Sequence, residues 1–319
     1  MRNLFKKSAF MSLMALLFAS LNAQQGESEF VRISLPSKQA TSSSTDVVKM
    51  AGLASDVDMD IPETGLVNPN RFALIIGNED YSSFQLGLES EADVEFAMND
   101  AKAFKIYANK VMGIPEENII LLLNATQMKM NIAIDKMVDI AKSMDGEAEI
   151  FFYYAGHGLP HEQTKEPYII PVDVGGSNIE YAIKLNDLYE KLNKYPSKRV
   201  TVFLDACFSG GGRNQGLVSA RAVKIKPKEN DFSGRMVVLS ASSGNQTSLP
   251  YKEKQHGMFT YYLLKILQQT EGDITYDDLS GYVTKQTTLK SVMVNSKEQN
   301  PQVAASPDIV HEWKSWNVR

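Results

Sequence analysis

The chain has 319 residues and a formal net charge of −5, from 33 Lys and Arg against 38 Asp and Glu. Its 43% hydrophobic and 22% charged residues are ordinary for a chain that buries a core, which excludes a disordered or collagen-like protein. The acidic balance argues against a nucleic-acid-binding protein, and the single cysteine, Cys207, excludes both an internal disulfide and a cysteine-rich metal site.

The first 23 residues have the layout of a secretory signal peptide. Arg2 and Lys6 give a positive start, an apolar run follows at 9–19, and small residues end at Ala23. The run is too short to span a bilayer, which takes about 20 residues. We therefore expect this segment to be removed. The mature protein is then exported to the periplasm or the extracellular space, with no membrane span.

Residues 24–70 lack the apolar periodicity of a core element and are interpreted as a linker or pro-segment. They include an alternating acidic stretch at Asp56, Asp58 and Asp60, which invites comparison with a calcium-binding loop. The comparison fails because Ile61 stands where the sharp turn of that loop needs glycine. We predict a solvated strand or tail here.

The chain from residue 71 to 319 is predicted to be one α/β domain with a mainly parallel sheet, because short apolar runs alternate with helical patterns. Runs that are apolar almost throughout are typical of strands covered on both faces. In such sheets the functional groups gather at the carboxyl ends of the strands. The expected strands are 72–77, 119–123, 149–154, 200–205 and 236–240, and the expected helices are 92–111, 128–144, 185–192, 258–268 and 276–288.

Two of these strands end in chemically suggestive sequences. The third runs into YYAGHG, which places His157 between two glycines, and the fourth runs into LDACFSGGG, which places Cys207 just past the strand. A thiol needs a base or an electropositive setting to attack a carbonyl, and His157 can supply it if the strands are neighbours. The backbone N–H of Gly158 is a candidate donor to a developing oxyanion. Either residue alone is more simply interpreted as a buried core residue. The occurrence of both His157 and Cys207 at matching strand ends favours a catalytic pair.

Together these motifs resemble the caspase-like cysteine peptidases, and most closely the metacaspases. ALIIGNEDY, NDA at 99–101, PVD at 171–173, LSASSGNQTS and GMFTYYLLKIL add to the resemblance. It implies a three-layer sandwich with a six-stranded, mainly parallel central sheet. It further implies that Cys207 is the nucleophile and His157 its partner, with Gly158 and the Cys207 amide forming the oxyanion hole.

The resemblance also implies a primary specificity. Metacaspases carry aspartates at the positions of Asp205 and Asp100, and two carboxylates facing a pocket favour a substrate Arg or Lys. The alternative is that Asp205 only caps a strand end, while Asp100 lies on a solvated helix face.

No cofactor is required by the resemblance, and calcium is left open. Asp173 matches a calcium ligand of the family, while Asp187 follows Asn186 where paired aspartates are usual. Asn214 stands near the position of a further ligand. Fewer charged oxygens mean weaker calcium binding, or none.

The segment between the fourth and fifth strands is long and basic, so a peptidase that prefers basic residues would find cleavable bonds in it. We predict a monomeric exported cysteine endopeptidase that cuts protein or peptide substrates after Arg or Lys and is made as a self-processing zymogen. Two alternatives stay open: a non-catalytic caspase-like binding module, and a caspase-like peptidase of different primary specificity. The candidate self-cleavage residues are Arg213, Arg221, Lys224, Lys226, Lys228 and Arg235.

Overall fold

The computed structural model describes residues 55–209, 232–244 and 246–319. A six-stranded sheet forms the centre of this part of the chain, with the strand order β11-β8-β7-β3-β1-β2. Five strands are parallel, and β11 pairs antiparallel with β8 at one edge. The strands are β1 (Arg71–Gly77), β2 (Ile119–Leu123), β3 (Glu149–Ala155), β7 (Arg199–Asp205), β8 (Met236–Ser240) and β11 (Gln302–Ala305).

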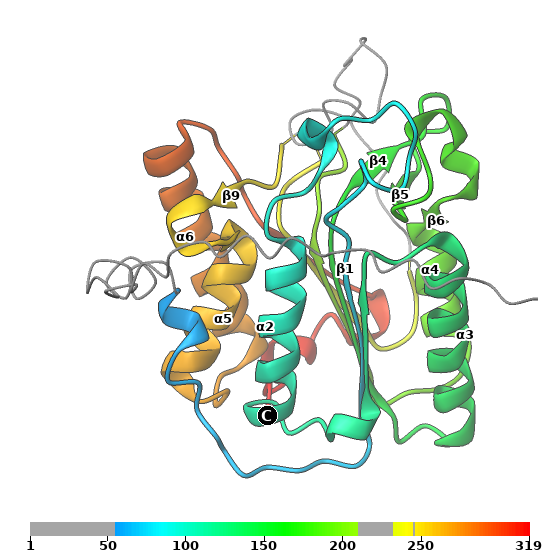
Figure 1. The fold of residues 1–319 in the computed structure, drawn as a ribbon. Helices are drawn as coiled ribbons and strands as arrows, with labels where there is room; N and C mark the ends of the chain where they lie inside the picture. Colours follow the sequence, from blue (N-terminus) through cyan, green and yellow to red (C-terminus); the bar gives the residue numbers. More distant parts are fainter. Residues whose placement is uncertain (1–54, 210–231, 245) are drawn as a thin grey trace, which may run out of the picture. The chain divides into compact units, whose positions relative to one another are not determined.

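Helices cover both faces of the sheet, which confirms the three-layer α/β prediction (Figure 1). Alternate residues of each central strand point to opposite faces, so Ile75 packs in one hydrophobic cluster and Ile76 in the other. Apolar side chains are therefore needed at almost every strand position. One face carries α2 (Ala97–Lys110), α5 (Met258–Thr270) and α6 (Tyr276–Asn295), and the other carries α3 (Gln127–Ser143) and α4 (Leu185–Leu192).

The predicted helices are all present, but α2 begins at Ala97 rather than Ala92. A 3-10 turn, η2 (Ser90–Ala92), comes first. Phe96 then has a positive φ of 73°, which a helical residue does not adopt. The apolar pattern continues through this break, so it could not mark where the helix starts.

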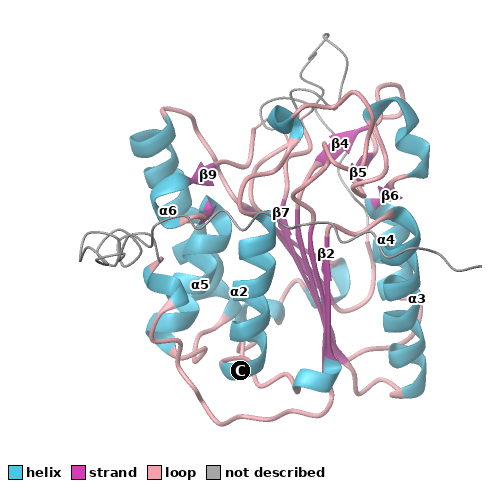
Figure 2. Cartoon of the chain, in the orientation of Figure 1, coloured by secondary structure: helices cyan, strands magenta, loops and turns pink. Residues whose placement is uncertain are grey.

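Several short strands were not predicted, because two or three residues carry no measurable periodicity. They form two small antiparallel sheets beside the main one (Figure 2). One joins β4 (Gly158–Pro160), β5 (Pro167–Ile169) and β6 (Ile183–Lys184), and the other joins β9 (Pro250–Tyr251) to β10 (His256–Gly257).

The acidic stretch before β1 is not the solvated tail that its sequence suggests. It forms a 3-10 turn, η1 (Asp56–Asp58), in which Val57 is fully buried in the core. The Tyr107 hydroxyl donates to the Val57 carbonyl oxygen at 2.7 Å. Asp56 forms ion pairs with Lys254 and Lys265, both at 2.8 Å. The prediction failed because one apolar residue among charges gives no periodic signal.

A buried ionic cluster lies where β1, β3 and β7 begin. The Glu149 carboxylate accepts from Arg71 Nε and Arg199 Nε, each at 2.9 Å, and all three side chains are at most 9% exposed. Burying a charge is costly unless it is paired, so these three groups depend on one another.

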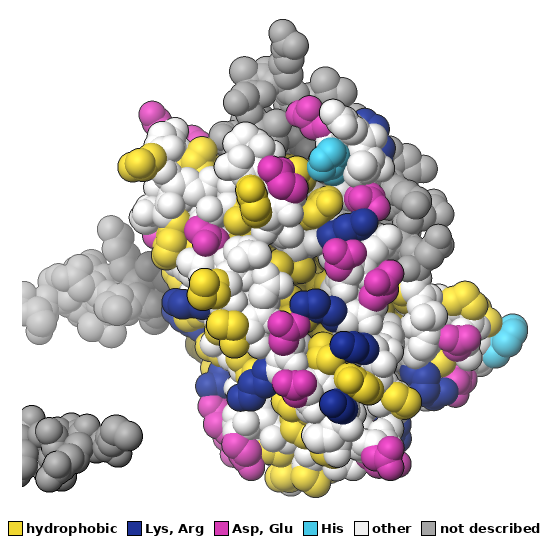
Figure 3. All heavy atoms as spheres, turned by 90° about the vertical axis from the view of Figure 1, so that its right-hand side faces the viewer, with side chains coloured by type: hydrophobic (Ala, Val, Ile, Leu, Met, Phe, Trp, Pro, Cys, Tyr) yellow, Lys and Arg dark blue, Asp and Glu magenta, His cyan; other side chains and the backbone are white. Residues whose placement is uncertain are grey.

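On the face formed by α3 and α4, acidic and basic side chains are interspersed without a continuous basic surface (Figure 3). Within the described ranges, no helix combines the length and the apolar character that crossing a bilayer requires.

Candidate active site

Strands β3 and β7 are neighbours, and their register places the two predicted catalytic residues at the same level. Ala155, at the end of β3, pairs with Asp205, at the end of β7. The backbone ladder continues one step further, since the N–H of Gly156 donates to the Asp205 carbonyl at 3.3 Å. His157 and Cys207 each follow two residues after this pair. Paired strands lie about 4.8 Å apart. His157 and Cys207 therefore follow the carboxyl ends of two adjacent strands.

The His157 imidazole is buried, and one of its nitrogens is held by the backbone. Its Nε2 atom lies 2.6 Å from the carbonyl oxygen of Ala92. A carbonyl oxygen only accepts hydrogen bonds, so Nε2 carries the proton in this arrangement. In the neutral ring, Nδ1 then keeps its lone pair and can act as a base.

Two tyrosines that the sequence interpretation missed fix the backbone of His157. The His157 N–H donates to the Tyr81 hydroxyl at 3.0 Å, and the Tyr154 hydroxyl lies 2.7 Å from the His157 carbonyl oxygen. Both side chains are fully buried, and the Tyr81 ring packs on the imidazole with centroids 4.5 Å apart. Tyr154 lies within the quoted YYAGHG motif, but the motif alone does not show that its hydroxyl bonds to the His157 carbonyl.

Cys207 is buried, and its sulfur contacts two polar groups. Sγ lies 3.1 Å from the Ser209 hydroxyl and 3.2 Å from the Gln246 carbonyl oxygen, to which the thiol donates. Gln246 is itself held, since its Oε1 accepts from the Asn300 N–H at 2.8 Å. The loop after β8 therefore forms one side of the cysteine's surroundings.

Gly158 packs directly on the segment that carries Cys207. A Cβ atom at this position would lie 2.9 Å from the Cys207 carbonyl oxygen and 2.5 Å from Phe208 Cε1. Only glycine therefore allows the start of β4 to approach the Cys207 segment this closely. The close approach explains the glycine after His157 on steric grounds.

The Asp205 carboxylate is buried and is hydrogen-bonded to the first turn of α5 and to the loop before β9. Its Oδ2 accepts from the N–H and the hydroxyl of Thr260 at 3.2 and 2.7 Å, and its Oδ1 accepts from the Ser248 hydroxyl. Ser248 and Thr260 lie in two motifs quoted for the resemblance, but their contact with Asp205 could not be predicted because it depends on where β7 ends.

Asp100 lies beside Asp205, as the resemblance implies, and not on a solvated helix face. It is 1% exposed, and a Cβ added to Gly257 would overlap Asp205 Oδ2 and lie 3.0 Å from Asp100 Oδ2. Burial raises the pKa of Asp100 to about 6, and the charge of Asp205 adds to the rise. Two carboxylates are therefore gathered close to the cysteine-bearing strand.

The sequence interpretation missed His256, which is fully buried next to Asp100. Its Nδ1 lies 2.7 Å from Asp100 Oδ1, and its Nε2 lies 3.2 Å from both carboxylate oxygens of Asp58. Burial alone would lower the pKa of His256, but the hydrogen bonds to Asp100 and Asp58 raise it to about 9. The imidazole is therefore a cation near neutral pH.

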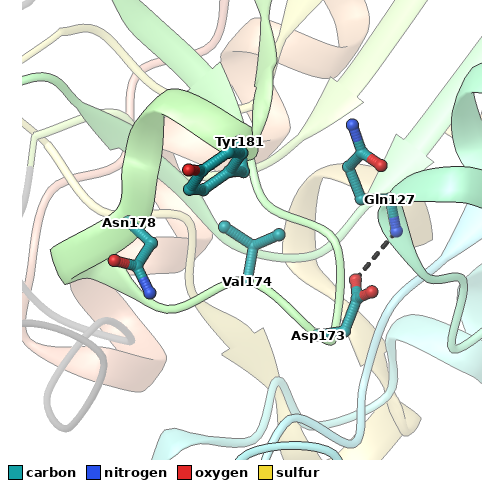
Figure 4. Close-up of a pocket in the computed structure, with 5 residues that line it drawn as sticks. All are labelled: Gln127, Asp173, Val174, Asn178 and Tyr181. Carbon is teal, nitrogen blue, oxygen red and sulfur yellow. Dashed lines mark hydrogen bonds between the residues drawn. The ribbon is translucent and has the colours of Figure 1, made fainter.

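The two residues considered as calcium ligands line different pockets. Asp173 lines a pocket of about 260 Å³, and its Oδ1 accepts from the Gln127 N–H at 2.8 Å, at the start of α3 (Figure 4). Asp187 lines an adjoining pocket of about 230 Å³, which shares Gln127 and Tyr181 with the first. Asn186 Oδ1 is buried, and no hydrogen-bond partner for it lies within residues 55–209, 232–244 or 246–319. Among the described residues, no three acidic, histidine or cysteine side chains come together as a metal site.

Of the candidate self-cleavage residues, only Arg235 is among those that the structure describes. Its guanidinium pairs with Glu312 at 2.7 Å, and its carbonyl oxygen accepts from Val200 in the sheet ladder. A bond held in a sheet is a poor protease substrate, so the structure disfavours cleavage after Arg235. Arg213, Arg221, Lys224, Lys226 and Lys228, and Asn214, lie outside the described residues.

Comparison with protein families agrees with this geometry. The caspase domain, a peptidase family, matches residues 70–308. The chain therefore belongs to the caspase-domain family, and its six-stranded, mainly parallel sheet is consistent with this membership.

Individual relatives are distant. A protein named as a probable protease from a Desulfuromonadales bacterium is 24% identical over 264 residues, covering 73% of this chain. The match spans only 31% of that relative's length. The crystal structure of a Geobacter sulfurreducens protein superposes with a TM-score of 0.57 at 19% identity, covering 78% of this chain and 98% of the other. This likeness supports the fold alone.

Proposed function

We propose that the protein is an exported cysteine endopeptidase that cleaves after Arg or Lys, with Cys207 as nucleophile and His157 as general base. The observation that carries the proposal is the matched register of β3 and β7, with Gly158 packed on the Cys207 backbone. Retention of both groups at one sheet edge argues against a non-catalytic binding module, which has no use for the pair.

The proposed reaction requires only the groups of the protein, the substrate and water. The Cys207 thiol passes its proton to Nδ1 of His157, and the sulfur attacks the substrate carbonyl, whose oxyanion accepts from the backbone N–H groups of Gly158 and Cys207. The carbon–nitrogen bond then breaks as the amine takes the proton from His157. Water hydrolyses the thioester, releases the acid and restores the thiol.

Asp205 and Asp100 are the proposed floor of the primary pocket. Two buried carboxylates near the nucleophile favour a substrate cation and disfavour an acidic side chain. The protein's own donors already bond to both carboxylates, which favours the alternative of a peptidase with another specificity. Turnover of fluorogenic peptides ending in Arg, Lys, Asp or Asn distinguishes the two. Cleavage only after Asp would refute the basic specificity.

The catalytic roles are tested by two variants, Cys207→Ala and Asp205→Asn. Cys207→Ala should abolish turnover while leaving the fold intact. Asp205→Asn removes a charge-assisted contact, so kcat/KM on Arg substrates should fall about ten- to a hundredfold. Alkylation of Cys207 by a small neutral reagent should change little. Equal losses in both assays would mean that Asp205 supports the nucleophile and not specificity.

Export and calcium are proposals with simple tests. Residues 1–23 lie outside the described part, and their sequence supports a mature protein that begins at Gln24. Mass analysis of secreted material checks this start. Turnover measured in EDTA and in calcium checks whether Asp173 or Asp187 contributes to a calcium site.

A further inference from the structure

A chain of hydrogen bonds runs from the turn η1 to the proposed pocket. Asp58 lies 3.2 Å from His256 Nε2, and His256 Nδ1 lies 2.7 Å from Asp100. Asp100 in turn lies beside Asp205, with Gly257 between them. Asp58 precedes the region that matches the caspase domain, residues 70–308. The region that matches the caspase domain therefore does not include Asp58, at which this series of hydrogen bonds begins.

Both imidazole nitrogens of His256 face carboxylates, which only accept hydrogen bonds when ionised. The ring must therefore donate from both nitrogens, and it is a buried cation with a negative group on each side. This cation holds Asp100 in place and offsets the burial that disfavours its charge. The amide of Gly257, the next residue, donates to the same carboxylate.

The turn that carries Asp58 is anchored independently of His256. Val57 is fully buried, and Gln268 Nε2 donates to the backbone carbonyls of Asp56 and Met59 at 3.0 and 2.7 Å. Asp56, two residues before Asp58, pairs with Lys254 and Lys265 instead. The two aspartates therefore share one turn but face different partners.

We propose that Asp58 and His256 are positioning residues of the specificity pocket, and that the segment before the caspase domain thereby sets the affinity for a basic substrate side chain. The inference rests on the proposed preference for Arg or Lys. Asp58 holds His256 from outside the domain, His256 holds Asp100, and Asp100 meets the substrate cation beside Asp205.

The test compares full-length wild-type protein with Asp58→Asn and with the matched control Asp56→Asn. Each variant removes one negative charge from the same turn, and the control also breaks two lysine ion pairs. The Asp58 side chain is 41% exposed, so solvent weakens its interaction with His256 and limits the expected change in KM. For an Arg peptide, Asp58→Asn should raise KM about three- to tenfold with kcat little changed. The reason is that Asp58 acts on Asp100 through their shared partner His256. Asp56→Asn should leave KM within about twofold.

A second readout does not depend on activity. The chain has four histidines, so ¹⁵N-detected imidazole titrations can resolve His256. Its pKa should fall in Asp58→Asn and stay unchanged in Asp56→Asn, and Asp58→Glu should restore both the titration and KM. The charged and titratable groups around this site are Asp58 and Asp56 of η1, Asp100 and Tyr107 of α2, Asp205 of β7, Lys254, and Tyr261 and Lys265 of α5.

The outcomes separate the two proposals. If wild-type protein cleaves after Arg and the two Asn variants behave alike, the inference is overturned and the proposed function stands. An unchanged His256 titration in Asp58→Asn would overturn it as well. If wild-type protein cleaves only after non-basic residues, the proposed specificity fails and the inference fails with it. Thermal unfolding of each variant shows whether a change in KM merely follows a loss of stability.

Discussion

The backbone N–H of Gly257 lies 3.1 Å from Asp100 Oδ1 and 2.9 Å from Asp100 Oδ2. The same residue has no room for a side chain, because a Cβ would overlap Asp205 Oδ2. Its φ of −61° is open to any residue, so the need for glycine here is steric and not conformational. Gly257 is therefore the spacer that lets two carboxylates share one site.

Gly257→Ala should displace one of the two carboxylates and lower kcat/KM on Arg peptides by at least about tenfold, comparable to losing a charge-assisted contact. The rate of Cys207 alkylation should stay near that of wild-type protein. Gly281→Ala on α6 is the control, since no atom of the described residues lies within 4 Å of a Cβ added there. Alanine should stabilise that helix by about 0.5–1 kcal/mol. Similar kinetics for the two variants would contradict the steric argument.

Tyr81→Phe should lower kcat on the best peptide about tenfold with little effect on KM, because it removes the hydroxyl that accepts from the His157 N–H. Tyr276→Phe is the matched control. It removes a hydroxyl 2.6 Å from Thr201 Oγ1 at the other end of the sheet, and it should cost about 1 kcal/mol of stability without changing kcat. A kcat loss of the same size in both variants would show that general loosening, and not His157, is responsible.

Glu149→Gln should lower the free energy of unfolding by about 3 kcal/mol at pH 7, because it leaves Arg71 and Arg199 buried without a counter-charge. Burial alone would raise the pKa of Glu149, but Arg199 and Arg71 lower it below its usual 4.5. The stabilisation is therefore present above pH 4.5 and is lost as the pH falls through the lowered value. Urea unfolding of both proteins at pH 7 and in acid measures this, and a constant difference would exclude the ionic explanation.

Purified wild-type protein should nick itself after one or more of five basic residues, whereas Cys207→Ala should remain whole. No cut is expected after Arg235, whose carbonyl is part of the sheet ladder. The fragments should stay associated, because β7 and β8 pair along their length. Intact-mass analysis over time decides the matter, and fully active protein that stays full-length would argue against a zymogen. The five residues are Arg213, Arg221, Lys224, Lys226 and Lys228.

The five parallel strands of the main sheet and the helices could be predicted because their signals are local, while the catalytic roles of His157 and Cys207 stay predictions. Apolar runs marked the five long strands within a residue or so, and the motif around His157 marked a strand end. The supporting residues could not be found in this way. Tyr81 lies 76 positions from His157, and Asp58 lies 198 from His256, so their roles exist only after the chain has folded. Val57 was missed because a single apolar residue among aspartates resembles solvated chain.

Strands β3 and β7 each carry an ionic group of the buried cluster at their first residue and lead to a proposed catalytic residue beyond their last. Substitutions at the first residues of these strands should therefore change a different quantity from substitutions beyond their last residues. Substitutions at Glu149 or Arg199 reduce the number of competent molecules, so activity per gram falls while turnover per titratable thiol stays constant. Substitutions near His157 reduce turnover per thiol while the thiol count holds. Normalising rates by active-site titration thus separates these two kinds of defect in any variant of this protein.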